Sequence, residues 1–400
     1  MDLKGKTVVL ALTGGIAAYK IATLASMLVK QKATVLVLMT ENATRFIAPL
    51  TFEALTGTRC MVDTFDRSFS FEIEHVAVAD RADLVLVAPA SANVIAKMAN
   101  GIADDMLTTT VLACRCPKLV APAMNTGMYE NPATQANLAR LREYGVEVID
   151  PACGRLACGA VGPGKMPEPQ QLLEHIQRHL ACQKDMAGLH LLVTAGPTRE
   201  ALDPVRFITN HSTGRMGYEL ARAAMLRGAQ VTLVSGPTAL EPPPFVELVR
   251  VESAQQMHDA VMAAAPAQDV IIKAAAVADY RPAHTAGEKI KKSGADLTLE
   301  LTRTPDILAE LGAARRPGQF LCGFAMETRD LLDNARAKLE KKGADMIVAN
   351  SLREAGAGFG GATNHVTLVE PTGCTELPLA GKDEVAHRIL DRILARRAGA

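Results

Sequence analysis

The feature that most constrains the fold is a pattern that occurs twice: an apolar strand, a glycine-containing turn, a helix and a further strand. In the first copy the apolar run 7–12 leads into the turn Thr13–Gly15. In the second copy the run 189–193 leads into Thr194-Ala-Gly-Pro-Thr198. A strand that ends in a glycine turn before a helix is how an α/β nucleotide-binding fold begins. The chain therefore predicts two α/β domains in one polypeptide.

Apolar runs continue to alternate with alanine-rich helical stretches through both halves. Because this alternation is typical of parallel sheets covered on both faces, we expect two Rossmann-like domains with mostly parallel sheets. The predicted domains are 1–188 and 189–400, joined by a short linker at 183–188. Helices are expected at 170–182 and 382–397. The expected strands are 7–12, 33–39, 83–88, 117–121, 146–149, 189–194, 229–234, 246–251, 269–274, 319–324, 345–349 and 365–370.

Composition excludes several classes of function. At 400 residues the chain is long enough for two cores. Its 43 basic and 43 acidic residues cancel, so no net field favours nucleic acid or an anionic membrane. No apolar run reaches the ~18–20 residues that a membrane span needs, and the N-terminal residues lack a signal-peptide pattern. The eight cysteines form no disulfide framework, which favours a reducing cytoplasm.

Ligands of parallel sheets bind at the carboxyl ends of the strands, and the first half has three candidate turns there. Gly14 and Gly15 would let an anion approach a helix N-terminus, although such a turn also serves structure alone. Ser91 follows the strand at 83–88 and is either a ligand or a simple helix cap. The segment 101–105 forms another turn of this kind.

Three further side chains in the first half have the chemistry of a proton-transfer site. Asn125 follows a strand, where its amide would hold a carboxylate or only close an Asx turn. His75 is a candidate base, although a lone histidine is more often structural. Cys158 lies in the glycine-rich segment 153–164, which is either a lid that delivers a proton or an ordinary exposed loop.

Taken together, four motifs of the first half resemble those of the homo-oligomeric flavin-containing cysteine decarboxylases. The match is closest to phosphopantothenoylcysteine decarboxylases, and the motifs fall in that family's order. They are Thr13-Gly-Gly-Ile-Ala-Ala-Tyr-Lys20, Ala88-Pro-Ala-Ser-Ala-Asn93, Pro122-Ala-Met-Asn125 with Met128, and Leu156-Ala-Cys-Gly159. The resemblance implies a flavodoxin-like flavoprotein domain.

This resemblance also implies a cofactor and roles for the candidate residues. The flavin would oxidise the substrate's thiol, which makes the carboxylate an easy leaving group. His75 would be the base, Asn125 would hold the carboxylate, and Cys158 would protonate the enethiolate. FMN would be bound by Gly14, Gly15, Ser91, Ala103, Asp104 and Met124.

The second half has features of a site for phosphate and carboxylate groups. The arginine-rich loop 199–215 suits such anions, or is a solvated polar loop. The small residues of 274–279 end a strand where a base or ribose could approach, or simply pack. Lys289, between Gly287 and Gly294, suggests a movable flap rather than a plain charge run. Finally, Lys338 and Lys342 share one helix face, which is otherwise an ordinary basic face.

These segments resemble phosphopantothenate–cysteine ligases over essentially the whole second half. The resemblance implies that CTP and Mg²⁺ convert 4′-phosphopantothenate to an acyl-cytidylate, from which cysteine displaces CMP. Asn210 would steady that intermediate, Lys289 would promote its formation, and Arg206 and Asn210 would contact the substrate. Asp279 would hold the metal. The nucleotide would be bound by Ala274, Ala275, Asp279, Lys289, Pro305, Asp306, Ile307, Leu308, Phe324, Lys338 and Lys342.

A decarboxylase followed by a ligase is similar to the layout of the bacterial bifunctional coenzyme A biosynthesis family. We therefore expect a cytoplasmic homo-oligomer, with trimers of the decarboxylase domain, that acts on small molecules. Three alternatives remain open: a regulatory flavoprotein without catalysis, a decarboxylase of peptide C-terminal cysteines, and a two-domain NAD(P) dehydrogenase. The last is weakened because the sequence has no GxGxxG followed by an acidic residue ~20 positions on.

Overall fold

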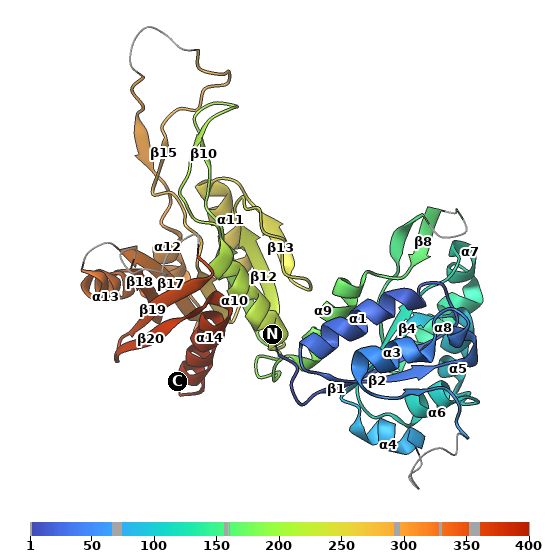
Figure 1. The fold of residues 1–400 in the computed structure, drawn as a ribbon. Coiled ribbons are helices and arrows are strands. Elements are labelled where there is room, and N and C mark those ends of the chain that lie inside the picture. The colour runs from blue at the N-terminus through green and yellow to red at the C-terminus, as the bar shows by residue number, and fades with distance from the viewer. Residues whose placement is uncertain are drawn as a thin grey trace. The chain divides into compact units, whose positions relative to one another are not determined.

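The computed structural model divides into two compact units, Met1–Cys182 and Gln183–Ala400 (Figure 1). The residues that it describes are 2–65, 74–155, 159, 161–291, 297–327, 330–351 and 361–399. Among these residues, no helix combines the length and the apolar character that a membrane crossing requires. Each unit is an α/β domain with its own sheet, as the repeated pattern predicted.

The first unit is built on a six-stranded parallel sheet in the order β3-β2-β1-β4-β5-β6. Its strands are β1 (Thr7–Leu12), β2 (Thr34–Met39), β3 (Cys60–Met61), β4 (Leu84–Ala90), β5 (Lys118–Pro122) and β6 (Glu147–Val148). Without the two-residue edge strand β3, this is the strand order of flavodoxin. The expected fold class is confirmed.

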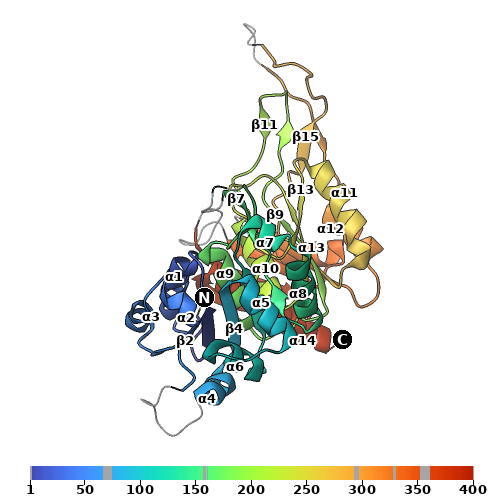
Figure 2. The ribbon, with the colours of Figure 1, turned by 90° about the vertical axis from the view of Figure 1, so that its right-hand side faces the viewer.

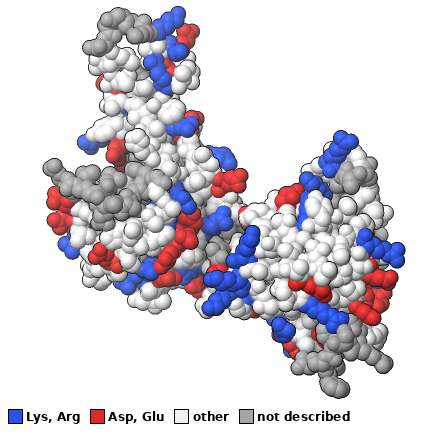
Figure 3. Space-filling model, viewed as in Figure 1, with Lys and Arg blue, Asp and Glu red and all other residues white. Residues whose placement is uncertain are grey.

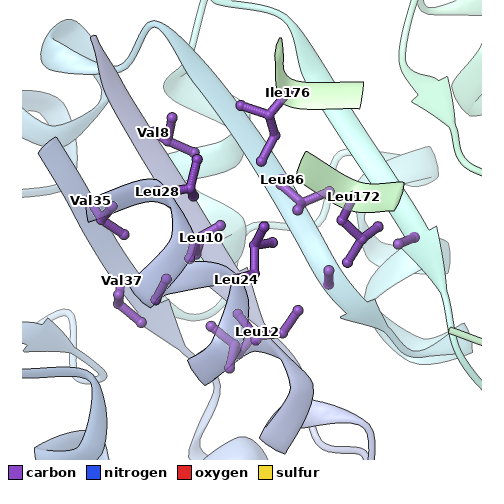
Figure 4. Close-up of a cluster of buried hydrophobic side chains, with 14 of the residues drawn as sticks. Val8, Leu10, Leu12, Leu24, Leu28, Val35, Val37, Leu86, Leu172 and Ile176 are labelled. Carbon is purple, nitrogen blue, oxygen red and sulfur yellow. The ribbon is translucent and has the colours of Figure 1, made fainter. Parts of the chain in front are cut away.

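Continuous apolar strands arise because both faces of this sheet are buried. Val8, Leu10 and Leu12 of β1 face one core, and Val9 and Ala11 face the other. Figure 4 shows the first core, where Leu24 of α1 and Leu172 of α9 meet the sheet. This core lies beneath α1 (Ala18–Lys30), α3 (Pro49–Thr56) and α9 (Pro169–Leu180). The opposite core lies beneath α4 (Glu74–Arg81), α5 (Ala92–Asn100), α6 (Met106–Ala113) and α8 (Pro132–Glu143).

The described residues of the glycine-rich part of the first unit include two strands where a loop was expected. Strands β7 (Ala152–Arg155) and β8 (Val161–Lys165) pair antiparallel and form a ribbon outside the main sheet. Two short helices, α2 (Glu41–Thr44) and α7 (Thr126–Tyr129), lie at the ends of β2 and β5. The sequence did not predict the ribbon because glycine and proline have low strand propensity.

The second unit has an eight-stranded mixed sheet in the order β13-β12-β9-β14-β17-β18-β19-β20. Its first six strands are parallel and repeat the strand order of the first unit, and the last two are antiparallel. The strands are β9 (His190–Ala195), β12 (Gln230–Ser235), β13 (Glu247–Arg250), β14 (Val270–Lys273), β17 (Phe320–Glu327), β18 (Met346–Ser351), β19 (Thr363–Glu370) and β20 (Gly373–Gly381).

Helices cover both faces of this sheet as well. On one face α10 (Arg215–Leu226) packs against α14 (Lys382–Ala398). The other face carries α11 (Ala254–Ala264), α12 (Ile307–Ala314) and α13 (Leu331–Lys342), whose buried residues share one core with the strands. A 3-10 turn, η1 (Ala265–Ala267), follows α11.

An arm projects from the second unit (Figures 1 and 2). It consists of two small antiparallel ladders, β10 (Glu200–Ala201) with β11 (Phe207–Ile208) and β15 (Tyr280–Pro282) with β16 (Leu301–Arg303). The ladders are joined where the Thr285 hydroxyl donates to the Ala201 carbonyl oxygen, at 3.1 Å. None of these ladders was predicted from the sequence.

The boundary between the units lies six residues before the predicted one. Residues 183–188 were expected to be a linker, but Met186 is fully buried and its N–H donates to the Arg227 carbonyl oxygen, at 3.0 Å. Asp185 also accepts two hydrogen bonds from the Arg227 guanidinium, at 2.6 and 2.9 Å. The segment is therefore part of the second unit, because its one large apolar side chain, Met186, is buried there.

Candidate functional site

The first candidate site lies at the switch point of the first sheet. The chain continues from β1 to β2 on one side and reaches β4 on the other side of β1, so the direction of the strand order switches between β1 and β4. Ligands of open α/β sheets bind at such a point. Thr13, Gly14 and Gly15 follow β1, and Ser91 follows β4, so the structure brings these predicted residues to one edge.

Thr13 connects the two strands across this point. Its hydroxyl donates to the Pro89 carbonyl oxygen at 2.6 Å and accepts from the Ser91 N–H at 2.9 Å. Ser91 in turn caps α5, accepting from the Val94 N–H at 3.4 Å. Both the cap and the turn that the sequence suggested are therefore present, and they fix the edge rigidly.

Glycine at position 14 is explained by close packing. A Cβ atom at Gly14 would lie 2.7 Å from the Cβ of Asn42 in α2. At Gly15 the nearest atom to such a Cβ would be 3.7 Å away, on Pro89, which is an ordinary contact, so packing does not require glycine at this position. A backbone without side chains at the start of a helix suits the phosphate group of a flavin nucleotide.

Asn125 and Met124 lie at the same edge, after β5, and the β7–β8 ribbon packs directly on them. The Met124 N–H donates to the Gly164 carbonyl oxygen at 3.1 Å, and a Cβ at Gly164 would be only 2.3 Å from the Met124 carbonyl oxygen. Asn125 is exposed, and its side-chain oxygen accepts from the Gly127 N–H at 2.8 Å. The Asx turn that the sequence suggested is therefore present, and the side chain of Asn125 is exposed.

The remaining predicted residues of the first unit lie in three different places. Ala103 and Asp104 are exposed after α5, and Lys97 pairs with Asp104 at 2.7 Å, which lowers the pKa of that carboxyl. His75 lies in the first turn of α4 and is half-buried. Cys158 lies outside the described residues, between the two strands of the ribbon.

The second candidate site is a cavity of about 650 Å³ at the carboxyl edge of the second sheet. It lies at the carboxyl ends of β9 and β14, where the chain goes from β9 to β12 on one side and reaches β14 on the other, which is the same switch point as in the first unit. With the exception of Lys289, every residue predicted to bind the nucleotide lines this cavity: Ala274, Ala275, Asp279, Pro305, Asp306, Ile307, Leu308, Phe324, Lys338 and Lys342. Asn210 lines it too.

Asn210 is fixed at the cavity wall by both ends of its amide. Its nitrogen donates to the Ala276 carbonyl oxygen at 2.8 Å, and its oxygen accepts from the Ser212 N–H at 2.8 Å. The chain then turns at Gly214, which has a φ of +79°, into the N-terminus of α10. A Cβ at Gly217 would lie 2.6 Å from that of Ala195, so this helix start sits directly against β9.

The cavity is strongly basic although the whole chain is neutral. Its described lining includes six basic residues, Arg215, Lys273, Arg303, Lys338, Lys342 and Lys382, against the two carboxylates of Asp279 and Asp306. On the outer surface in view, by contrast, both signs of charge are interspersed (Figure 3). A concave site with this excess of positive charge suits a polyphosphate ligand.

Two cations of the cavity have defined partners. Lys342 pairs with Asp306, which also caps α12 by accepting from the Ala309 N–H at 3.1 Å. Burial raises the pKa of Asp306, but the hydrogen bonds from Lys342 and the Ala309 N–H, together with the charges of Lys342 and Lys273, outweigh it and the pKa is lowered. Lys338 donates to the Phe324 carbonyl oxygen at 2.8 Å. These contacts hold α12 and α13 against β17 at the cavity.

Two predicted residues of the ligase site do not line the cavity but lie on the arm. Arg206 makes hydrogen bonds of 2.5 and 2.9 Å with buried Asp203, and donates to the Ile290 carbonyl oxygen at 2.9 Å. The Arg206 guanidinium holds the pKa of Asp203 well below its usual range. Lys289 is the exposed neighbour of Ile290. In this structure, therefore, neither side chain lines the cavity.

Some lining residues were not predicted as site residues, among them Lys273, Asn350, Asn364 and Lys382. A lysine that closes an apolar strand, as Lys273 does, was a signal that could have been used. Asn350 and Asn364 had no such signal, because they meet only through the pairing of β18 with β19. No group of three metal-binding side chains occurs among the described residues. Asp279, the predicted metal ligand, lines the cavity.

Comparisons with known proteins agree with the division into two units. Residues 1–181 match the family model "Flavoprotein", and residues 186–396 match "DNA/pantothenate metabolism flavoprotein C-terminal domain". Over its full length the chain is similar to proteins named Coenzyme A biosynthesis bifunctional protein CoaBC. It is 49% identical to that of Bacillus subtilis (strain 168) over 397 residues, with 98% of each chain covered.

Two further matches carry the same name. The chain is 42% identical to the protein of Escherichia coli (strain K12) over 399 residues, covering 99% of this chain and 98% of that one. A crystal structure of the C-terminal domain of Coenzyme A biosynthesis bifunctional protein CoaBC is 45% identical. It covers 55% of this chain and 100% of the solved one, with a TM-score of 0.47.

Proposed function

The chain belongs to the family of coenzyme A biosynthesis bifunctional proteins, and from this premise we propose what each unit does. The second unit joins 4′-phosphopantothenate to cysteine through an acyl-cytidylate, using CTP and Mg²⁺. The first unit then decarboxylates the 4′-phosphopantothenoylcysteine to 4′-phosphopantetheine with FMN. Thus 1–188 is assigned as the decarboxylase domain and 189–400 as the ligase domain, with 183–188 structurally part of the latter.

The observation that carries the ligase proposal is the convergence of ten predicted nucleotide residues on one basic cavity. They come from the segment between β14 and β15, from the middle of β17, from the start of α12 and from α13, so only the fold brings them together. The one predicted metal ligand, Asp279, fits Mg²⁺, which is commonly held by one or two carboxylates together with substrate phosphates. Asn210, fixed at both ends, would orient the acyl group beside the nucleotide.

The decarboxylase proposal is supported by the edge formed by Thr13, Ser91 and Asn125. The partly exposed glycine turn after β1 fits the phosphate of FMN. The residues that would hold the cofactor are Gly14, Gly15, Ser91, Ala103, Asp104 and Met124. When bound, the flavin supplies the oxidation of the substrate's thiol. The exposed amide of Asn125 would bind the substrate carboxylate.

Two proton transfers complete the decarboxylation. His75 would accept the proton of the substrate's thiol, and Cys158 would return a proton to the reduced product. The β7–β8 ribbon packs on the Met124–Asn125 backbone, so the chain on either side of Cys158 is anchored beside the proposed carboxylate site.

We extend the proposal to assembly and location. The chain would act in the cytoplasm as a homo-oligomer, with trimers of decarboxylase units, which would allow residues of different subunits to share one site. In agreement with a reducing compartment, all seven described cysteines are free thiols.

One experiment tests both activities. The purified protein is incubated with 4′-phosphopantothenate, cysteine and Mg²⁺, with CTP or ATP added separately, and the products are followed by mass spectrometry. We expect 4′-phosphopantetheine with CTP. Accumulation of 4′-phosphopantothenoylcysteine would remove the decarboxylase from the proposal, and a product formed with ATP alone would remove the use of CTP. A yellow, folded protein that forms no product would support the regulatory alternative instead.

A further inference from the structure

Lys273 is a cavity residue to which neither the motifs nor the proposed reaction assigns a role. It is the last residue of β14, where it pairs in register with Thr194 of β9 and Gly323 of β17. These two neighbours carry no charge. The Lys273 side chain is half-buried and lines the cavity at the carboxyl end of β14.

The charged groups that act on Lys273 are two lysines and two carboxylates. Lys338 and Lys342 of α13 lie close enough to act on it, as do the carboxylates of Asp306 and Asp279. Lys342 already pairs with Asp306, and Lys338 donates to a backbone carbonyl oxygen. For Lys273 itself, the described part of the chain provides no hydrogen bond and no ion pair. Three ammonium groups thus share two carboxylates.

This arrangement makes the charged form of Lys273 costly. Burial lowers the pKa of its ammonium to about 8, and the like charges of Lys338 and Lys342 contribute in the same direction. The carboxylates of Asp306 and Asp279 oppose the shift without reversing it. A half-buried lysine that lines a cavity and has no polar partner among the described residues is poised to pair with an anionic ligand.

We propose that Lys273 binds a phosphate group of the nucleotide in this cavity and takes up a proton as the nucleotide binds. The proposal rests on the nucleotide use proposed above and deepens it by naming a further binding residue. A phosphate is the fitting group, because the base and ribose are neutral and would leave the excess charge uncompensated. A bound phosphate also explains why β14 ends in a lysine at the switch point.

The proposal predicts how CTP affinity depends on pH. An anion beside Lys273 favours its charged form, so the pKa in the complex lies above the value of about 8 in the free protein. Affinity is therefore full below about pH 8 and falls as pH rises through the pKa of the complex. At pH 8 about half of the free protein molecules take up a proton on binding.

Isothermal titration calorimetry of the full-length protein with CTP tests this. Titrations at pH 7, 8 and 9 in buffers of different ionisation enthalpy give both the affinity and the number of protons taken up. Lys273→Met should weaken binding about tenfold or more at pH 7 and abolish this proton uptake. Lys273→Arg keeps the charge at every pH, so it should retain affinity, take up no such proton and lose the decline above pH 8.

Controls separate a contact from a structural effect. Lys341→Met removes an exposed lysine from the same helix as Lys342 and should bind CTP like the parent. Thermal unfolding of each variant establishes that it is folded, and cytidine, which has no phosphate, should lose little affinity in Lys273→Met. Equal losses for CTP and cytidine, or unchanged CTP binding by the folded variant, would overturn the proposal. No CTP binding by the parent would instead overturn the assigned nucleotide.

Discussion

At the scale of single residues, Asn210 has the best-defined geometry of the predicted catalytic groups. Its amide donates to the Ala276 carbonyl oxygen, so Asn210→Asp would place a carboxylate against that oxygen. We expect the ligase rate to fall at least about tenfold, because one charged repulsion replaces a hydrogen bond. Decarboxylation of supplied 4′-phosphopantothenoylcysteine should not change. An unaltered ligase rate in a coupled CMP-release assay would remove Asn210 from the site.

His75 gives the complementary test in the first unit. His75→Asn keeps a polar side chain in the first turn of α4 but removes the proposed base. Decarboxylation should fall by about 10²-fold or more, since general-base catalysis contributes that much. Ligation should proceed normally, so the intermediate accumulates and is detected by mass spectrometry. If both activities were lost, the change would have damaged the fold rather than one site.

At the scale of elements, strand β6 is joined to helix α9 by one carboxylate and two imidazoles. Glu147 receives hydrogen bonds from His175 at 2.5 Å and His179 at 2.7 Å. Burial alone would raise the pKa of Glu147, but these two bonds outweigh it and hold the pKa well below its usual range. These histidines are one helical turn apart, which is why both reach the same side chain.

This cluster predicts a pH dependence of stability. A carboxyl whose folded pKa is depressed stabilises the fold above its unfolded pKa of about 4.3, and this contribution is lost as pH falls further. Glu147→Gln should lower the free energy of unfolding of the first unit by about 1–2 kcal/mol at pH 6. It should also flatten the decline below about pH 4, measured by urea unfolding. An identical acid limb in both proteins would contradict the assigned role.

Elements also show what the sequence could and could not predict. The long strands were found because both sides are buried, which makes runs such as 7–12 continuously apolar. The two-residue ladders of the arm bury little and have no such pattern. Residues 183–188 were predicted to be a linker, and the sequence could not reveal otherwise. The burial of Met186 and the pairing of Asp185 with Arg227 both depend on tertiary contacts.

The site residues that could be predicted from the sequence likewise differ from those that depend on tertiary contacts. Residues contributed by strand ends and motifs, such as Ala274, Ala275 and Asp279, were predicted and line the cavity. Asn350 and Asn364 were missed because their positions depend on the antiparallel pairing of β18 and β19, which no local pattern encodes. Lys289 and Arg206 belong to the arm, whose direction from the body is set by tertiary contacts.

At the scale of the whole molecule, the boundary itself can be tested. A fragment starting at residue 183 keeps buried Met186 and the Asp185–Arg227 pair, whereas one starting at residue 189 loses both. The shorter fragment should be less stable by about 2–5 kcal/mol, the range for removing a buried methionine side chain. Thermal unfolding of the two fragments compares them directly. Equal midpoints would mean that the segment contributes nothing and that the predicted linker was correct.

The contrast between a neutral chain and a basic cavity has a kinetic consequence. With 43 charges of each sign, the molecule has no net charge to draw a distant nucleotide, so capture should depend little on salt. Once bound, a triphosphate is paired with the cations within a few ångströms, inside the Debye length, where added salt screens the attraction only weakly. Stopped-flow measurements from 50 to 500 mM salt should therefore show that both the association rate and the residence time of CTP change only modestly, and a steep salt dependence of either would locate the attraction outside the cavity. Such an enzyme would hold its nucleotide by local charge while remaining indifferent to other polyanions in solution.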